Sequence, residues 1–231
     1  MTSATIIYQN LTLGARQIRK LVIEEGQGDD PIVTKLEKGN IEDHDFTVFS
    51  YCWGLPADDK QRITVNGHPY SIRSNGLNAL RALRTAVGPT TVWIDELCID
   101  QTSAEDMQQQ LEKMGQLYAE AKAVVVWLGD LQSDICPIET LRGFAQDPGA
   151  HWDKSLKSVL KALNVLFTHP WFHRTWTFFE AVTANSTLLY RSSREVFSAE
   201  ELDRFLSSFY HHFESLHCCA PASSGTVRCM G

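Results

Sequence analysis

Polar and ionisable side chains gather directly after one predicted strand. The strand spans residues 90–94, which are mostly β-branched or aromatic, and neither Gly nor Pro separates it from the polar cluster. The cluster contains Asp95, Glu96, Cys98, Asp100 and Gln101. In an open α/β sheet the ligand crevice lies just beyond the carboxyl ends of the strands, so these groups could bind a ligand or act in catalysis. The alternative is a polar turn that only caps the next helix.

A second predicted strand ends in further functional side chains. Residues 46–52 are rich in β-formers and apolar enough for a central position in a sheet, and the run stops before Gly54 and Pro56. Ser50, Tyr51 and Trp53 therefore stand at its carboxyl end.

Alternating strands and helices are expected to position both groups. A helix from Ser74 or Asn75, with leucines at helical spacing, precedes the strand at 90–94, and a helix over 103–121 follows it. Residues 123–128 then form a buried strand. This order predicts a doubly wound sheet of mostly parallel strands.

The flanking segments add smaller elements. Strands at 17–24 and 32–36 are expected to form an edge ribbon, and the Asn66-Gly67 turn predicts a hairpin over 62–72 as a surface flap. Beyond residue 131 we expect short helices at 138–145 and 155–168, a helix from about Thr175, a strand at 186–190 and a helix at 197–213. Residues 1–216 are interpreted as one domain and 217–231 as a disordered tail.

Composition narrows the class of protein. The 231 residues are 43% hydrophobic and carry a formal net charge of −7, with scattered Lys and Arg, which argues against nucleic acid as a partner. No apolar run is long enough to span a bilayer, and residues 1–10 do not resemble a signal peptide. The six cysteines have no regular spacing. We therefore expect a soluble cytoplasmic protein with reduced thiols and no membrane span.

Other chemistries have little support. No spacing pairs Cys98 with a histidine as a nucleophile, and the His and Cys residues at 211–219 match no zinc pattern. Neither a Gly-x-Gly-x-x-Gly motif nor a P-loop is present. We therefore expect no metal site and no resident cofactor.

Seven segments together resemble the fungal heterokaryon-incompatibility (HET) domain, in the order in which that family has them. They are residues 49–54, 63–72, 75–84, 93–101, 114–121, 125–129 and 174–180, and the resemblance covers about residues 15–205. The sequence departs from the family pattern at Asp100, Thr175 and Phe179, where the family generally has Asn, Gly and Gln.

This resemblance implies a fold and an activity. HET domains act in allorecognition between fungal individuals and in the cell death that follows, and they look distantly like TIR domains. The implied fold is an α/β, TIR-like (flavodoxin-like), mostly parallel sheet flanked by helices, with an added β-hairpin and helical insertions. Many TIR domains hydrolyse NAD through the glutamate of a Trp-x-x-x-Glu pattern, and Trp176 to Glu180 fits that pattern.

The resemblance makes Glu180 the essential carboxylate. Four residues apart on a helix, Trp176 and Glu180 would share a face, so the indole could wall a pocket into which the carboxylate points. Departure of nicotinamide leaves oxocarbenium-like charge on the ribose, which a carboxylate stabilises. Asp95 is the second candidate for a catalytic carboxylate.

The substrate-binding residues expected on this interpretation come from the two strand ends and from residues 174–176. They are Ser50, Tyr51, Trp53, Trp93, Gln101, Arg174 and Trp176. The aromatic rings would stack on nicotinamide or adenine, Ser50 and Gln101 would bond ribose or phosphate oxygens, and Arg174 would pair with pyrophosphate. For each of them the alternative is packing, capping or a structural ion pair.

The resulting hypothesis is a cell-death effector that hydrolyses NAD as its substrate and works as a homo-oligomer. Two alternatives remain open. One is a non-catalytic module that binds signalling partner proteins or its own copies, and the other is a nucleotide sensor without turnover.

Overall fold

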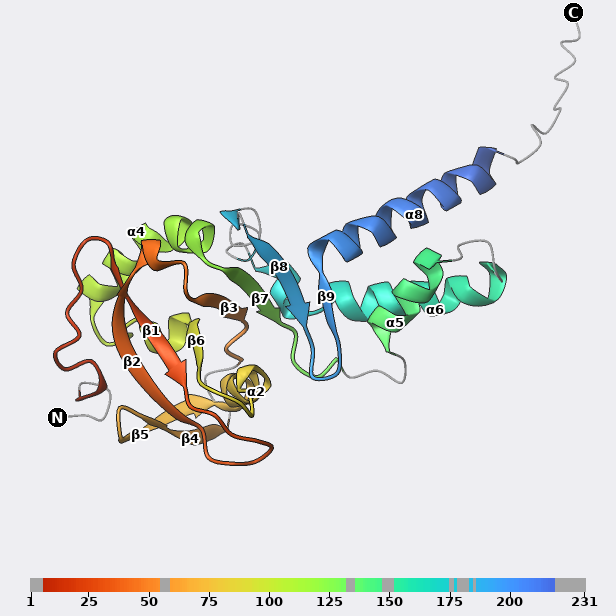
Figure 1. The fold of residues 1–231 in the computed structure, drawn as a ribbon. Helices are drawn as coiled ribbons and strands as arrows, with labels where there is room; N and C mark the ends of the chain where they lie inside the picture. The colour runs from red at the N-terminus through yellow and green to blue at the C-terminus, as the bar shows by residue number, and fades with distance from the viewer. Residues whose placement is uncertain are drawn as a thin grey trace, which may run out of the picture. The chain divides into compact units, whose positions relative to one another are not determined.

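The described part of the chain contains a nine-stranded mixed sheet and several helices (Figure 1). This computed structural model describes residues 6–54, 59–131, 136–146, 152–174, 177, 183–184 and 186–218. The strands are β1 (Gln17–Ile23), β2 (Val33–Asn40), β3 (Thr47–Tyr51), β4 (Lys60–Val65), β5 (His68–Arg73), β6 (Thr90–Trp93), β7 (Ala123–Trp127), β8 (Thr187–Arg191) and β9 (Val196–Ser198). Their order in space is β5-β4-β2-β1-β6-β3-β7-β8-β9.

Four neighbouring strands form the parallel centre of the sheet. β3 pairs in parallel with both β6 and β7, and β7 pairs in parallel with β8. Along the chain these strands follow as β3, β6, β7 and β8, whereas in space their order is β6-β3-β7-β8. Numbered along the chain, the spatial order is therefore 2-1-3-4. The direction in which the chain crosses the sheet reverses at β3, and crevices form outside the carboxyl ends of strands at such a point.

The sheet as a whole is not mostly parallel, which corrects the prediction. β1 runs antiparallel to both β2 and β6, β4 to β5, and β8 to β9. The predicted edge ribbon is also wrong, because β1 lies between β2 and β6 in the middle of the sheet. The predicted flap is the β4–β5 hairpin, which continues the sheet beyond β2. Hydrophobic spacing predicts strands but not the direction in which they pair.

The helices mostly lie where their apolar spacing predicts them. They are α2 (Ser74–Leu83), α3 (Asp95–Cys98), α4 (Ala104–Glu120), α5 (Pro137–Gln146), α6 (Trp152–Phe167) and α8 (Ala199–Cys218), with 3-10 turns η1 (Ile41–Asp43) and η2 (Pro170–His173). α2 lies in the chain between β3 and β6, and α4 lies between β6 and β7; these two crossovers run in opposite directions across the sheet.

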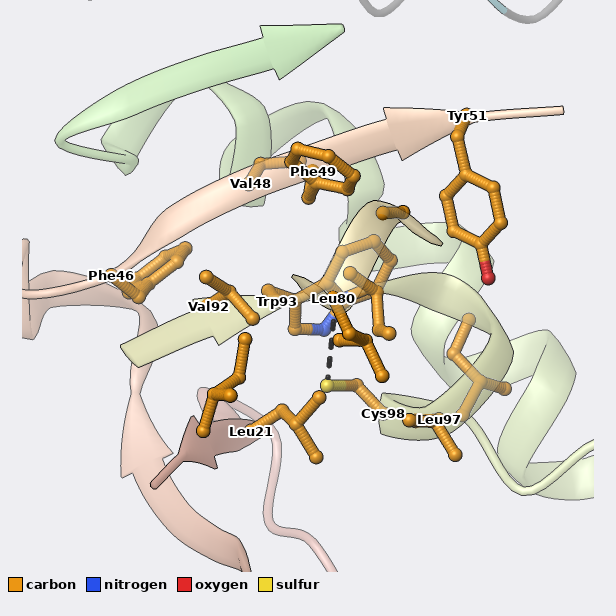
Figure 2. Close-up of a cluster of buried hydrophobic side chains, with 14 of the residues drawn as sticks. Leu21, Phe46, Val48, Phe49, Tyr51, Leu80, Val92, Trp93, Leu97 and Cys98 are labelled. Carbon is orange, nitrogen blue, oxygen red and sulfur yellow. Dashed lines mark hydrogen bonds between the residues drawn. The ribbon is translucent and has the colours of Figure 1, made fainter. Parts of the chain in front are cut away.

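The core of the sheet region is apolar and continuous. Figure 2 shows side chains of β3, β6 and α3 packed together, with Trp93 among Val92, Leu80 and Cys98. Trp93 is 1% exposed and its ring meets Tyr118 of α4 edge-on. This packing fixes the strand ends from which the predicted site residues project.

The contacts divide the chain into two compact units. The first comprises residues 1–132 and 165–199, and the second comprises 133–164 and 200–231. In the second unit Phe144 of α5 packs against Phe205 and Phe209 of α8, and Arg142 forms an ion pair with Glu201. Residues 219–231, most of the predicted tail, lie outside the described residues. Among the helices of the described part, none has the length and apolarity needed to cross a membrane.

Candidate functional site

A pocket of about 300 Å³ lies beyond the carboxyl ends of β3 and β6. Four residues that the sequence singles out line it: Trp53, Asp95, Gln101 and Arg174. The rest of the lining is apolar and consists of Ile99, Met107, Leu111 and Met114. An indole, a carboxylate, an amide and a guanidinium thus share one cavity, although they come from segments far apart in the sequence.

Asp95 and Trp53 form one wall of the pocket. The Trp53 indole Nε1 donates to Asp95 Oδ1 at 2.8 Å, and the Glu96 backbone N–H donates to the same oxygen at 2.7 Å. Gln101 Nε2 donates to the Asp95 carbonyl at 2.8 Å. Because α3 turns the chain directly after β6, the carboxylate and the amide of this segment lie at the same cavity.

Arg174 reaches the pocket from the segment after η2. Its Nη1 donates to the Tyr51 carbonyl at 3.0 Å, at the end of β3. Thr177 is 2% exposed, and its hydroxyl lies 2.6 Å from the carbonyls of both Trp171 and Arg174. The backbone around Arg174 is therefore held against β3, while the residue itself is exposed.

The floor of the pocket comes from α4. Met107, Leu111 and Met114 recur at i, i+4 and i+7, so they share one face of the helix. Met114 is 8% exposed, whereas Leu111 is 51% exposed. Methionine and leucine side chains suit the face of a flat ring, because they adapt their shape and methionine sulfur packs favourably on aromatic groups.

The start of α4 is fastened to β1 by a buried ion pair. Arg19 Nη1 and Nη2 donate to the two carboxylate oxygens of Asp106 at 2.7 and 3.0 Å, and Asp106 also accepts the Asp100 backbone N–H at 2.7 Å. Arg19 Nη1 further donates to the Cys98 carbonyl at 3.0 Å. These contacts hold the Asp95–Gln101 segment against the helix that forms the floor.

Three of the expected ligand-binding residues do not line this pocket. Ser50 Oγ accepts a hydrogen bond from Trp171 Nε1 at 2.8 Å, and Tyr51 donates its hydroxyl to Glu96. Ser50, Tyr51 and Trp93 are 5%, 2% and 1% exposed. These side chains support the strand ends from within, and we assign them no direct contact with a ligand.

Two residues shape the site in ways that the sequence did not predict. Asn75, one of the two residues at which the helix was expected to begin, donates to the Cys52 carbonyl at 2.6 Å and accepts from Trp127 Nε1 at 3.0 Å, so it joins the ends of β3 and β7. Glu96 turns into the protein, and burial raises the pKa of its carboxyl. Burial of the Tyr51 hydroxyl, and after it the nearby charge of Glu96, raises the pKa of Tyr51 well above its usual range. The inward turn after β6 is not readable from side-chain periodicity.

Trp176 and Glu180, two further predicted site residues, lie outside the described residues. Cys98 is fully buried, and desolvation raises the pKa of its thiol to about 12, so it is a poor nucleophile near neutral pH. Within the described ranges, no three His, Cys, Asp or Glu side chains are grouped as ligands for a metal ion.

The combination of groups suits a ligand with a flat ring and an anionic part. A ring would lie on the apolar floor beside the Trp53 indole. Asp95 can accept hydrogen bonds from sugar hydroxyls, and the Arg174 guanidinium is a planar donor for phosphate oxygens. The cavity volume lies at the lower end of the range for small-molecule sites.

Comparison with known proteins identifies the family. The model of the family "Heterokaryon incompatibility protein (HET)" matches residues 46–180, which is more than half of the chain. "Heterokaryon incompatibility protein 6, OR allele" of Neurospora crassa is 40% identical over 60 residues, which make up 25% of this chain and 9% of that protein. The match thus spans less than a tenth of the relative's length. No solved structure matches the chain significantly. The chain belongs to the heterokaryon incompatibility (HET) family.

Proposed function

We propose that this chain is a cell-death effector domain of fungal heterokaryon incompatibility that binds NAD in the pocket beyond β3 and β6 and hydrolyses it to nicotinamide and an ADP-ribose product. The observation that carries the proposal is the joint lining of one cavity by Trp53, Asp95, Gln101 and Arg174 over an apolar floor. The link to heterokaryon incompatibility rests on family membership and on the name of the relative, and the cell-death role is the part of the proposal that the family resemblance implies.

The order of the parallel strands supports the TIR-like part of the proposal. In flavodoxin-like sheets the strands follow the order 2-1-3-4-5. The order β6-β3-β7-β8 has the same first four steps, and the pocket lies at the carboxyl end of β3, where the direction of crossing reverses. The antiparallel strands on either side are additions to this centre.

Asp95 and Arg174 have separate tasks in the proposed reaction. Arg174 pairs with the pyrophosphate, while the nicotinamide ring lies on Met107 and Met114. Asp95 accepts hydrogen bonds from the ribose of the nicotinamide half. The Trp53 indole and the Glu96 backbone N–H both donate to Asp95 Oδ1, which keeps the carboxylate oriented.

Glu180 supplies the second carboxylate of the mechanism. Its assignment comes from the Trp-x-x-x-Glu pattern at residues 176–180, which resembles that of TIR domains. The N-glycosidic bond breaks with its electron pair retained by the nicotinamide nitrogen, and Glu180 stabilises the positive charge on the ribose. Water then adds to the anomeric carbon and releases a proton. Nicotinamide leaves as a neutral ring, so no general acid is needed.

The direct test is release of free nicotinamide from NAD by the purified protein at high and low concentration. We expect wild type to release nicotinamide, most strongly when concentrated, because self-association is part of the proposal. Glu180→Gln should abolish release, and Asp95→Asn should reduce it about 10²-fold or more. Glu112→Gln, which neutralises an exposed carboxylate of α4, is the matched control and should behave like wild type. Unchanged NAD at every protein concentration would exclude the enzyme.

One observation favours a second candidate function. Leu111 lines the pocket and is 51% exposed, as expected of a surface that receives an apolar side chain from a partner protein. On this alternative the chain is a non-catalytic signalling module. Saturable NAD binding without release of nicotinamide would instead identify a nucleotide sensor.

A further inference from the structure

We propose that Glu96 is a positioning residue that holds the Trp53–Asp95 wall of the pocket in place from inside the protein. The importance of that wall for a ligand rests on the proposed function, but the role of Glu96 in holding it does not. Glu96 is not among the residues that line the pocket. It acts through the side chains that it contacts.

Glu96 is buried although it is a carboxylic acid. It is 7% exposed, and no other acidic residue is buried among the residues whose burial the structure describes. Buried carboxyl groups are costly unless hydrogen bonds compensate them. The Tyr51 hydroxyl donates to Glu96 Oε2, and the Arg73 backbone N–H interacts with the same carboxyl group.

Tyr51 and Arg73 end the two strands that lie next to Trp53. Tyr51 is the last residue of β3 and precedes Trp53 by two residues. Arg73 is the last residue of β5, and its guanidinium carbon lies 5.1 Å from the centre of the Trp53 ring. Glu96 therefore contacts the ends of both β3 and β5, and the Trp53 indole follows the first and packs on the Arg73 side chain of the second.

The backbone of Glu96 completes the arrangement. Its N–H donates to Asp95 Oδ1, the oxygen that also accepts the Trp53 indole N–H. Glu96 thus contacts both Asp95, which accepts the indole N–H, and Arg73, whose guanidinium packs on the indole ring. Besides Tyr51 and Arg73, the charged or titratable groups that interact with this region are Lys60, Tyr70 and Asp95.

Replacement of Glu96 by leucine would leave the buried Tyr51 hydroxyl without its acceptor and would remove the carboxyl group that faces the Arg73 N–H. The Tyr51 hydroxyl would have to find a new partner, which requires the end of β3 to shift relative to β5. Because Trp53 follows the end of β3 and packs on Arg73, its hydrogen bond to Asp95 should lengthen or break. Glutamine keeps a carbonyl oxygen of similar reach and should preserve the hydrogen bond from Tyr51.

The experiment follows the indole N–H signals of the six tryptophans by ¹⁵N NMR without any ligand. Trp53→Phe identifies the Trp53 signal. In Glu96→Leu we expect the Trp53 signal to move and its exchange with solvent to accelerate at least tenfold, whereas Glu96→Gln restores both. The signals of Trp127, bonded to Asn75, and Trp171, bonded to Ser50, should move less than that of Trp53, because neither indole bonds to Asp95 or Glu96.

Two results would overturn the proposal. One is an unchanged Trp53 signal in Glu96→Leu, and the other is a movement of Trp127 and Trp171 as large as that of Trp53, which would mean that Glu96 stabilises the fold in general. If Glu96→Leu does not fold, Tyr51→Phe removes the hydroxyl that donates to Glu96 and is judged by the same signals. Failure of the wild type to bind NAD would contradict the proposed function and leave these outcomes unaffected.

Discussion

Replacement of Asp106 should lower the free energy of unfolding far more than replacement of an exposed carboxylate, because Asp106 belongs to a buried ion pair. Its side chain is 12% exposed and that of Arg19 is 5% exposed. The carboxylate accepts hydrogen bonds from both terminal nitrogens of Arg19 and from the Asp100 backbone N–H. Asp106→Ala removes three hydrogen bonds and leaves a guanidinium charge buried without its carboxylate.

The expected loss follows from that count. Breaking a buried ion pair by removing one partner costs about 3–5 kcal/mol, a large share of the roughly 5–15 kcal/mol that stabilises a typical domain. Asp106→Asn keeps one carbonyl acceptor and should lose about half as much. The double variant Arg19→Met/Asp106→Leu should lose less than Asp106→Ala, because no buried charge then remains.

The assay is the free energy of unfolding from urea titration, with fluorescence as the probe. Glu105→Ala is the matched control: Glu105 lies in the same first turn of α4 but is exposed, so it should cost at most about 1 kcal/mol. If Asp106→Ala loses no more than Glu105→Ala, the ion pair does not hold α4 against β1, and our account of how the pocket floor is fixed fails.

Three further predictions concern two glycines, the Glu96 carboxyl and the Cys98 thiol. Gly76→Ala should destabilise the protein by about 1–3 kcal/mol in urea titration, because the added methyl would lie 2.9 Å from the Tyr51 hydroxyl, whereas Gly143→Ala, with open space around it, should stabilise by about 0.5–1 kcal/mol. Equal effects at both glycines would contradict the packing. Burial raises the folded-state pKa of Glu96 above 4.5, so the stability that its protonated form contributes is lost as pH rises through that pKa. Glu96→Gln should therefore gain stability relative to wild type from pH 4.5 upward, and a difference independent of pH would refute this. Cys98 should resist alkylation in the native state and react only on unfolding, as mass spectrometry would show; rapid modification of the folded protein would contradict its burial.

The sequence predicted the central strands and the membership of the pocket better than the sheet around them. β3, β6 and β7 are short β-branched or apolar runs, and such runs rarely form anything but buried strands. Asp95, Gln101 and Trp53 follow those strands directly, so a shared edge of the sheet was enough to bring them together.

Other features depend on interactions that local sequence does not contain. The insertion of β1 beside β6 is set by tertiary pairing, which hydrophobic periodicity does not report. Ser74 and Asn75 were both candidates for the start of α2, because serine and asparagine favour that position, but the Asn75 side chain bonds the ends of β3 and β7. The inward direction of Glu96 depends on contacts with Tyr51 and Arg73, which are distant in sequence.

The most direct test of the central claim uses the methionine methyl groups as probes of the pocket. The chain has four methionines, and Met107 and Met114 line the cavity, whereas Met1 and Met230 serve as references. In ¹³C-methyl NMR of the Glu180→Gln variant, titration with NAD should shift the Met107 and Met114 signals with one common saturation curve and leave the references unchanged. If NAD leaves both pocket signals in place, or moves all four alike, the pocket beyond β3 and β6 is not the nucleotide site.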